Sequence, residues 1–154
     1  MKKIILAMVA VMVPLMLSAG STDFWFRHFS VEDGLSSSAV RAIMQDKYGF
    51  MWLGTDDGLN RYDGTTIKIY RLNPEGVNDY ISFLYDTTDR IWIGTGDGVY
   101  IYDYETENFE PFKLLTAKGD SIKTNVNHIA EDRDGNLWFS TVGQGIFKYN
   151  VSKH

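Results

Sequence analysis

One sequence pattern occurs three times along the chain, and it constrains the fold more than any other feature. Its copies span residues 40–64, 81–103 and 126–150. Each copy has an Asp six residues before a Trp and a Thr three residues after that Trp, followed by a Gly and, four residues later, a Tyr. Repeats of this kind pack against their neighbours, so the repeat decides the architecture. The shared positions are Trp52, Trp92 and Trp138; Asp46, Asp86 and Asp132; and Tyr62, Tyr102 and Tyr149.

The spacing of the repeat predicts the class of fold. The tryptophans lie 40 and 46 residues apart, and a period near forty with short strands is typical of β-propeller blades. Turns rich in Asp and Gly separate runs of β-forming residues. We therefore predict an all-β fold of four-stranded antiparallel blades, about three of them, with repeats at about 39–71, 80–113 and 126–150. In the first copy we expect strands at about 39–45, 50–55, 59–62 and 66–70.

The two ends of the repeat array are incomplete. Residues 24–30 resemble the outer fourth strand of a blade, and the third copy stops after its third strand, which gives twelve expected strands. Propellers have four to eight blades, and repeats at an open end expose apolar faces. We expect either that this chain is the beginning of a longer protein, which we favour, or that copies of it close a ring together.

The first twenty residues predict export. Lys2 and Lys3 precede an apolar run at residues 4–17, and small residues follow at 18–21. The apolar run is shorter than the roughly 20 residues of a membrane-spanning helix, so residues 1–20 are predicted to be a signal peptide and 21–154 a partial propeller. An uncleaved anchor is the alternative. The predicted location is the periplasm, with membrane contact only through the signal segment or regions downstream.

Composition excludes several partners and chemistries. The formal net charge of −5 argues against nucleic acid as a partner. The chain has no cysteine, which excludes disulfides, thiolate metal sites and a cysteine nucleophile. The aromatic share of 14% favours β-structure.

The first copy, with the residues before it, resembles a known family. Residues 26–46 read F-x-x-F-S-V-E-D-G-L-S-S-S-x-V-R-A-I-M-Q-D, and residues 49–64 read G-F-M-W-L-G-T-D-D-G-L-N-R-Y-D-G. This pattern is similar to the two-component regulator propeller repeat, found in the periplasmic sensors of hybrid two-component system proteins of glycan-degrading bacteria. Ser140 departs from it by replacing the Gly of W-x-G-T, and one extra residue precedes Gly145. The third blade is therefore expected to be slightly irregular.

The resemblance implies a much larger protein. Its members have paired seven-bladed propellers and an immunoglobulin-like connector. A membrane span and cytoplasmic histidine kinase, receiver and DNA-binding domains follow. By this resemblance the chain is the N-terminal part of such a sensor, and the kinase activity lies outside it.

The repeated residues are better explained by structure than by chemistry. A Trp at the same place in every copy is expected to pack between blades rather than to stack on a sugar. Asp132 could begin a calcium loop, but the sixth and twelfth positions are then Leu137 and Gly143, which do not fit. We predict no metal site and no cofactor.

No catalytic residue is predicted. Glycosidases need two carboxyl groups at a defined separation, and nothing singles out a pair among the available acids. The three histidines lack metal-ligand spacing, and the serines at 36–38 are expected to form a turn. The residues considered were Glu32, Asp33, Asp56, Asp57, Asp97, Asp120, His28, His128 and His154.

These observations predict a non-catalytic, ligand-sensing propeller segment of a periplasmic hybrid two-component sensor, responding to oligosaccharides. Its expected partners are a carbohydrate and the remaining blades of a longer chain or a second copy. The alternative is a stand-alone exported propeller closed by self-association, acting as a lectin or scaffold; a glycoside hydrolase or lyase is less favoured. The ligand-binding residues are not predicted, although the least repetitive segment, 113–125, is the first candidate, with a plain surface insertion as the other explanation.

Overall fold

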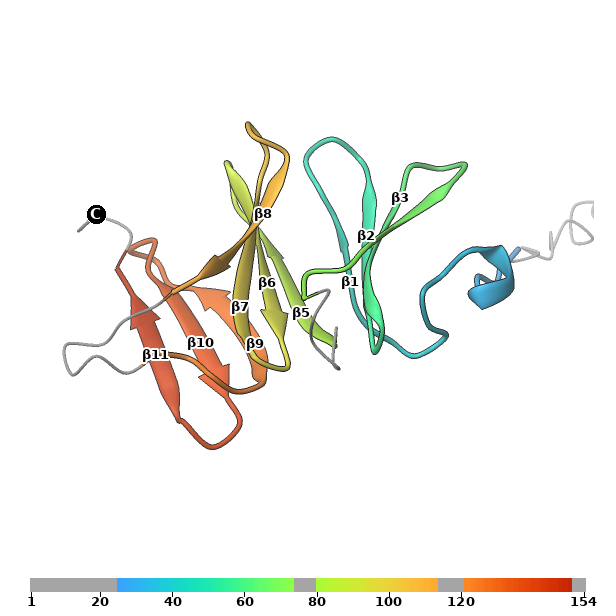
Figure 1. The fold of residues 1–154 in the computed structure, drawn as a ribbon. Helices are drawn as coiled ribbons and strands as arrows, with labels where there is room; N and C mark the ends of the chain where they lie inside the picture. The colour runs from blue at the N-terminus through green and yellow to red at the C-terminus, as the bar shows by residue number, and fades with distance from the viewer. Residues whose placement is uncertain (1–24, 74–79, 114–120, 151–154) are drawn as a thin grey trace, which may run out of the picture.

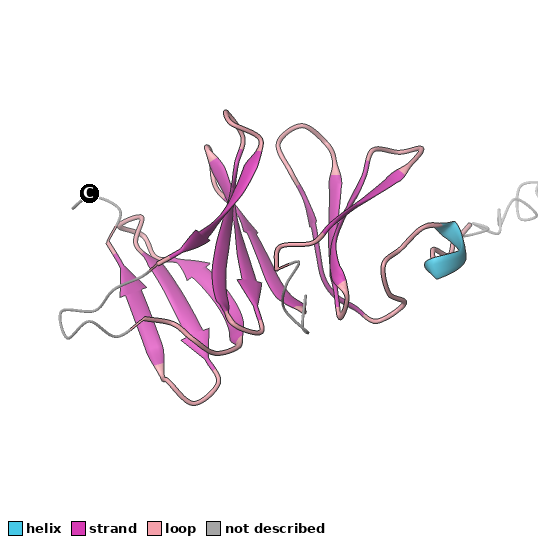
Figure 2. Ribbon diagram, in the orientation of Figure 1, coloured by secondary structure: helices cyan, strands magenta, loops and turns pink. Residues whose placement is uncertain are grey.

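The computed structural model describes residues 25–73, 80–113 and 121–150, which form three antiparallel sheets. The sheets stand side by side in chain order, like the blades of a fan (Figure 1), and strands dominate throughout (Figure 2). The predicted all-β fold with propeller-type blades is confirmed. The predicted signal peptide lies outside the described residues, within which no helix is long and apolar enough to cross a membrane.

Each of the first two blades has four strands in sequential order, and the third has three within the described residues. The first blade contains β1 (Val40–Gln45), β2 (Met51–Thr55), β3 (Gly58–Tyr62) and β4 (Ile67–Tyr70). The second contains β5 (Ile81–Asp86), β6 (Arg90–Thr95), β7 (Gly98–Asp103) and β8 (Asn108–Phe112). The third contains β9 (Val126–Glu131), β10 (Leu137–Thr141) and β11 (Ile146–Tyr149).

The strands of the first blade begin and end within one residue of their predicted bounds. The turns explain this agreement, because Asp and Gly stop each strand locally. In the β2–β3 turn, Gly58 adopts a φ of 113°, a backbone conformation that residues with a Cβ rarely adopt. Its carbonyl accepts a hydrogen bond from the Thr55 hydroxyl.

The sequence predicted a strand at residues 24–30. The structure describes residues 25–30 of this segment, and they belong to no strand, so the prediction is wrong there. Trp25 and Phe26 are more than 90% exposed. A segment becomes a strand of a sheet only where its backbone can pair with the free N–H and C=O groups of an edge strand. The outer edge of the third blade, β11, lies at the other end of the fan from this segment (Figure 1). The described residues therefore hold eleven strands rather than twelve.

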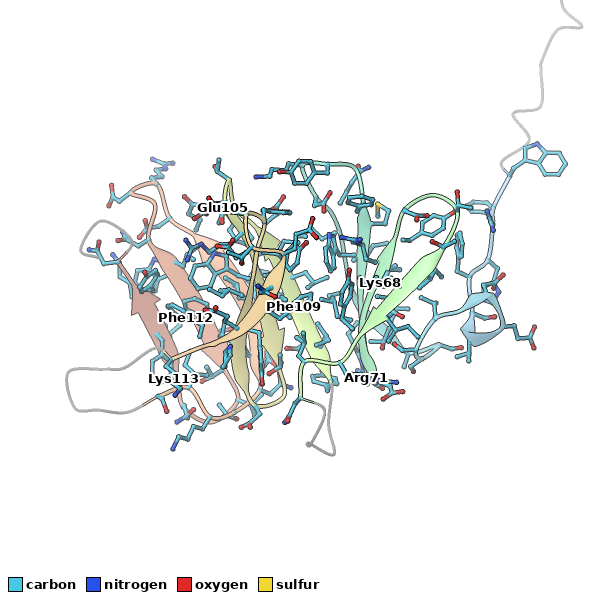
Figure 3. All side chains as sticks on the ribbon, turned by 45° about the horizontal axis from the view of Figure 1, so that its top comes forward. Lys68, Arg71, Glu105, Phe109, Phe112 and Lys113 are labelled. Atoms are coloured by element: carbon cyan, nitrogen blue, oxygen red, sulfur yellow. The ribbon has the colours of Figure 1, made fainter. Side chains whose placement is uncertain are left out.

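The hydrophobic core lies between the blades, in two clusters. One cluster joins Trp52 and Leu59 of the first blade to Ile91 of the second, and the other joins Trp92 of the second blade to Ile129 and other residues of the third. The outer strand β8 contributes one side chain to each cluster. Phe109 and Phe112 are an odd number of residues apart, so they project to opposite faces (Figure 3).

Neighbouring blades come close together at the glycine of the W-x-G-T sequence. A Cβ added at Gly54 would lie 2.6 Å from Ile81 Cγ2, and one at Gly94 would lie 3.0 Å from the Val126 carbonyl oxygen. Each glycine therefore makes room for the inner strand of the next blade. Ser140 stands at the same place in the third blade, whose far face no described residue covers.

The third blade also carries the expected irregularity. Its extra residue lengthens the β10–β11 turn, which is closed by a hydrogen bond from the Thr141 amide to the Gly145 carbonyl. Gly143 and Gly145 both have positive φ, of 88° and 76°.

Candidate functional site

The repeated Asp and Trp of the first blade form one hydrogen-bonded unit. Trp52 Nε1 donates to an oxygen of the Asp46 carboxylate at 2.7 Å. The other oxygen accepts from the backbone amides of Tyr48 and Phe50, each at 2.9 Å. Asp46 is 6% exposed. One buried carboxylate thus ties the β1–β2 turn to the centre of the blade.

The third blade repeats this arrangement. Trp138 Nε1 donates to Asp132 at 2.8 Å, and the carboxylate also accepts from the amides of Asp134 and Asn136. The hydrogen bond from Trp138, followed by that from the Asn136 side chain, holds the pKa of Asp132 well below its ordinary value. Lys148 Nζ lies 3.4 Å from the same carboxylate.

The second blade lacks this Asp–Trp hydrogen bond, although Asp86 and Trp92 have the same spacing. Asp86 accepts a hydrogen bond from the Tyr104 hydroxyl at 2.8 Å. Burial raises the pKa of Asp86, and burial together with this hydrogen bond raises the pKa of Tyr104. Trp92 is 3% exposed, yet its Nε1 has no hydrogen-bond partner among the described residues.

One difference between the blades lies in the turn after β7. Tyr104 occupies the place, two residues beyond the repeated Tyr, where the first blade has Gly64. The first blade's own turn then holds Tyr104. Lys47 Nζ lies 4.2 Å from the centre of the Tyr104 ring, and the ring of Tyr48 packs edge-on against it at 5.3 Å.

The structure places the three repeated tryptophans in two different environments. Trp52 is fully buried between blades, with Tyr70, Tyr102 and Phe109 around it at ring distances of 5.2 to 6.3 Å. Trp92 is enclosed in the same way by Phe112, Phe139 and Tyr149. Trp138 is 37% exposed.

The repeated tyrosines alternate with the tryptophans across the fan. Tyr102 of the second blade packs on Trp52 of the first, and Tyr149 of the third packs on Trp92 of the second. Tyr62 of the first blade lies against Phe29 and donates to the Gly64 carbonyl. Both the Trp and the Tyr positions therefore contribute to the blade interfaces.

Two hollows open at the end of the blades that carries the β1–β2 and β5–β6 turns. The smaller, about 440 Å³, lies between the first and second blades and is lined by Asp46, Arg61 and Tyr104 among others. The larger, about 860 Å³, lies between the second and third blades and is lined by Asp86, Trp92 and Leu137 among others. Neither hollow could be predicted from the sequence, because each is formed by two blades.

Three of the acids considered as catalytic groups are held by neighbouring residues. Asp56 pairs with Arg41 at 2.7 Å and Asp57 with Arg71 at 2.5 Å. Asp33 caps the short 3₁₀ turn Val31–Asp33 by accepting from the Ser30 amide. The structure does not bring these carboxylates together into a pair.

Ser36 and His128 are likewise held by neighbours. The Ser36 amide donates a hydrogen bond to the side-chain oxygen of the fully buried Asn60, and the Ser36 hydroxyl lies 2.8 Å from the Thr55 hydroxyl. His128 packs on Phe83 with ring centres 4.2 Å apart. Among the described residues, no group of three or more His, Asp or Glu could hold a metal ion. Asp120 and His154 lie outside those residues.

The candidate recognition segment 113–125 is described only at its ends. Ile122 is buried, and the Lys123 amide donates to the Gln144 side chain at 3.0 Å. These contacts attach the end of the segment to the β10–β11 turn, on the third blade. The part at 114–120 lies outside the described residues.

Comparison with known proteins finds similar chains among bacterial signalling proteins. The two component regulator propeller family matches residues 34–57 and 121–143. Histidine kinase P4 from Formosa agariphila is 56% identical over 59 residues, which are 38% of this chain and 4% of that protein.

Solved structures show the same blades. The extracellular domain of a hybrid two component system from B. thetaiotaomicron superposes with a TM-score of 0.72 at 30% identity, over 82% of this chain and 19% of that one. An inactive virginiamycin B lyase from Staphylococcus aureus has a TM-score of 0.52 at 15% identity, over 73% of this chain and 41% of that one. The second likeness is one of fold alone. The chain spans less than a fifth of the length of either two-component relative.

Proposed function

We propose that this chain, which is built from two-component regulator propeller repeats, is a non-catalytic sensing segment in the exported, periplasmic part of a hybrid two-component sensor. The observation that carries the proposal is the likeness, at 30% identity and over 82% of the chain, to the extracellular domain of such a system. The matched family repeats at both ends of the described blades support it.

The signal sensed is proposed to be an oligosaccharide. A ligand can shift a conformational equilibrium only by binding one state more tightly than the other. The blades offer hollows between them where a ligand could bind differently as the blades shift. The kinase that reads this shift belongs to other parts of the proposed sensor.

The engaged side chains support sensing rather than catalysis. Hydrolysis of a glycoside uses two free carboxyl groups about 5 to 9.5 Å apart across the scissile bond. Asp56 and Asp57 instead form ion pairs with arginines.

The experiment is a thermal-shift screen of the full chain against a panel of oligosaccharides, with each sugar recovered and analysed afterwards. We expect at least one sugar to raise the midpoint temperature in a saturable way and to be recovered intact, since a ligand that binds only the folded state stabilises it. Recovery of cleaved sugar would favour a hydrolase or lyase instead. Stabilisation by none of the sugars would contradict oligosaccharide sensing.

We further propose that the remaining blades of a longer chain cover the far face of the third blade. Trp138 is 37% exposed there and Ile146 is 69% exposed, whereas the matching Trp52 is fully buried by the next blade. Exposed apolar repeat faces normally have a cap or a neighbour. Light scattering of the full chain tests this: monomers or open aggregates are expected, and a discrete dimer would favour the stand-alone, self-closed propeller.

A further inference from the structure

The smaller hollow, between the first and second blades, contains an arginine without a carboxylate partner. Arg61 lines this hollow and is half-buried, with its guanidinium carbon 4.6 Å from the centre of the Phe50 ring and 5.6 Å from that of Trp52. Arg90, the other half-buried arginine among the described residues, pairs with Asp89 at 2.6 Å. Arg61 forms no hydrogen bond or ion pair with any described residue. A charge held partly out of water normally has a partner, so this cation is available to a ligand.

A tyrosine of the second blade brings an unpartnered hydroxyl to the same hollow. Tyr102 is 4% exposed, and its ring lies 5.2 Å from that of Trp52, on which Arg61 also packs. Its hydroxyl has no hydrogen-bond partner among the described residues. Unlike Nε1 of Trp92, this hydroxyl keeps accessible surface, so a ligand in the hollow can reach it. Burial, followed by the charge of Glu107, raises the pKa of Tyr102, so the hydroxyl keeps its proton near neutral pH and can donate it in a hydrogen bond.

The residues that line this hollow leave one unpaired charge of each sign. Asp46 lines it, but hydrogen bonds from Trp52 and two backbone amides occupy both oxygens of that carboxylate. Glu107 lines it too, is exposed, and forms no hydrogen bond or ion pair with any described residue. The charges of Arg61 and Glu107 act on the pKa of Tyr102 in opposite directions, so both lie near its hydroxyl.

These groups fit a ligand that itself carries both charges. A carboxylate has only acceptor atoms, so it matches the donors of a guanidinium and a phenolic hydroxyl. A simple anion would be repelled by Glu107 and a simple cation by Arg61, whereas a zwitterion is attracted by both. The rings of Tyr48, Phe50 and Tyr104 also line the hollow and suit an aromatic body. The volume of about 440 Å³ is within the range of small-molecule sites.

We propose that this hollow binds a small zwitterion with an aromatic body, as a free aromatic amino acid is. Arg61 and Tyr102 hold its carboxylate, and its ammonium group faces Glu107. The inference goes beyond oligosaccharide sensing and does not rest on it. Because the two use different ligands, a failed screen of sugars would leave this site standing, and the reverse holds as well.

Isothermal titration calorimetry of the full chain tests the class of ligand. Phenylalanine is the probe, 2-phenylethylamine lacks its carboxylate, and N-acetylphenylalanine lacks the charge on its nitrogen. We expect saturable binding of phenylalanine and about tenfold weaker binding of each analogue, because each loses one charge-assisted contact. The absence of phenylalanine binding, or equal affinity for either analogue, would overturn the proposal.

Two variants assign the binding to the hollow. Arg61→Gln should weaken phenylalanine binding about tenfold and abolish the preference over 2-phenylethylamine, because the carboxylate loses its charged partner. Glu107→Gln should abolish the preference over N-acetylphenylalanine for the corresponding reason. Lys148→Gln is the matched control and should bind phenylalanine as the unchanged chain does. Lys148 stands opposite the repeated Trp of the third blade, as Arg61 does in the first.

Tyr102→Phe guards against a folding defect, since it removes only the unpartnered hydroxyl and keeps the ring that packs on Trp52. We expect an unchanged midpoint temperature of unfolding and about fivefold weaker phenylalanine binding, the loss of one hydrogen bond. In the ¹⁵N-labelled chain, phenylalanine should move the indole signal of Trp52, beneath Arg61, and leave that of Trp138 in place. Unchanged affinity in Arg61→Gln and Tyr102→Phe, or a response of Trp138 alone, would overturn this site.

Discussion

The first and second blades carry the same Asp and Trp at the same spacing but use them differently. Asp46 accepts from Trp52, whereas Asp86 accepts from Tyr104 and leaves Trp92 without a partner among the described residues. The residue two places after the repeated Tyr is one difference, Gly64 in the first blade and Tyr104 in the second. The turn after the repeated Asp is another, with Gly49 in the first blade and Asp89 in the second. A repeat can thus keep its frame while side chains in its turns change the partner of a buried carboxylate.

The hollows beside these two blades differ in the same sense. The one next to the first blade is smaller, and its wall includes Asp46, whose carboxylate is fully used by Trp52 and two amides. The one next to the second blade is larger, and its wall includes Trp92 with its unused donor.

The largest effect is expected from removing a tryptophan that two blades enclose. Trp52→Ala should lower the free energy of unfolding by about 3–5 kcal/mol, because it leaves a cavity among three aromatic rings. Trp138→Ala, on the exposed face, should cost only about 1 kcal/mol. Urea unfolding followed by circular dichroism measures both, and equal losses would show that exposure does not distinguish the two positions.

The Asp–Trp contrast itself is tested by removing each carboxylate. Asp46→Ala should cost about 2–3 kcal/mol, since it leaves the buried Trp52 N–H and two turn amides without their acceptor. Asp86→Ala removes the hydrogen bonds from the Tyr104 hydroxyl and the Lys47 backbone, but it also removes the cost of burying that carboxylate, so it should cost less than about 1 kcal/mol. The same urea titrations decide the matter, and a larger loss for Asp86→Ala would reverse our ranking.

The close approach of the inner strands gives a smaller effect. Gly54→Ala should cost about 1–2 kcal/mol, because its Cβ would lie 2.6 Å from Ile81 Cγ2 and force the second blade to shift. Ser140→Ala is the matched control and should change the free energy of unfolding by less than about 0.5 kcal/mol. A neutral Gly54→Ala variant would show that the blades adjust at no cost.

The smallest effect separates the two kinds of carboxylate by pH. The pKa of Asp132 is lowered by its hydrogen bonds from the ordinary 3.8, so its contribution to stability is present above pH 3.8 and is lost as the pH falls through the lower, folded value. The pKa of Asp86 is raised by burial from 3.8, so the folded state binds that proton more tightly and loses stability as the pH rises through the window above 3.8.

Carboxyl ¹³C titration of the folded chain measures both groups directly. We expect Asp132 to titrate below 3.8 and Asp86 above it. The variants Asp132→Asn and Asp86→Asn should each remove one of the two opposite slopes from the dependence of stability on pH. Titration of both groups on the same side of 3.8 would mean that the second blade binds its Asp as the third does.

The sequence by itself determined the class of fold and the strands of each blade. Alternating side chains and Asp- and Gly-rich turns act over a few residues, so the bounds of β1 to β4 could be read to within one residue. It also predicted the resemblance to the two component regulator propeller repeat, whose family model matches residues 34–57 and 121–143. It did not identify the strand at 24–30 correctly, because pairing depends on a distant edge.

Only the tertiary structure decided how the repeated residues are used. Trp52, Trp92 and Trp138 occupy the same position in their repeats, yet the first two are buried and Trp138 is 37% exposed. The exposed fraction depends on whether another blade covers that face. It likewise joined Asp46 to its own Trp but Asp86 to Tyr104, since Lys47 and Tyr48 of the neighbouring blade hold that tyrosine. Hydrogen bonds and hollows between blades depend on both partners at once, and no single repeat contains that information.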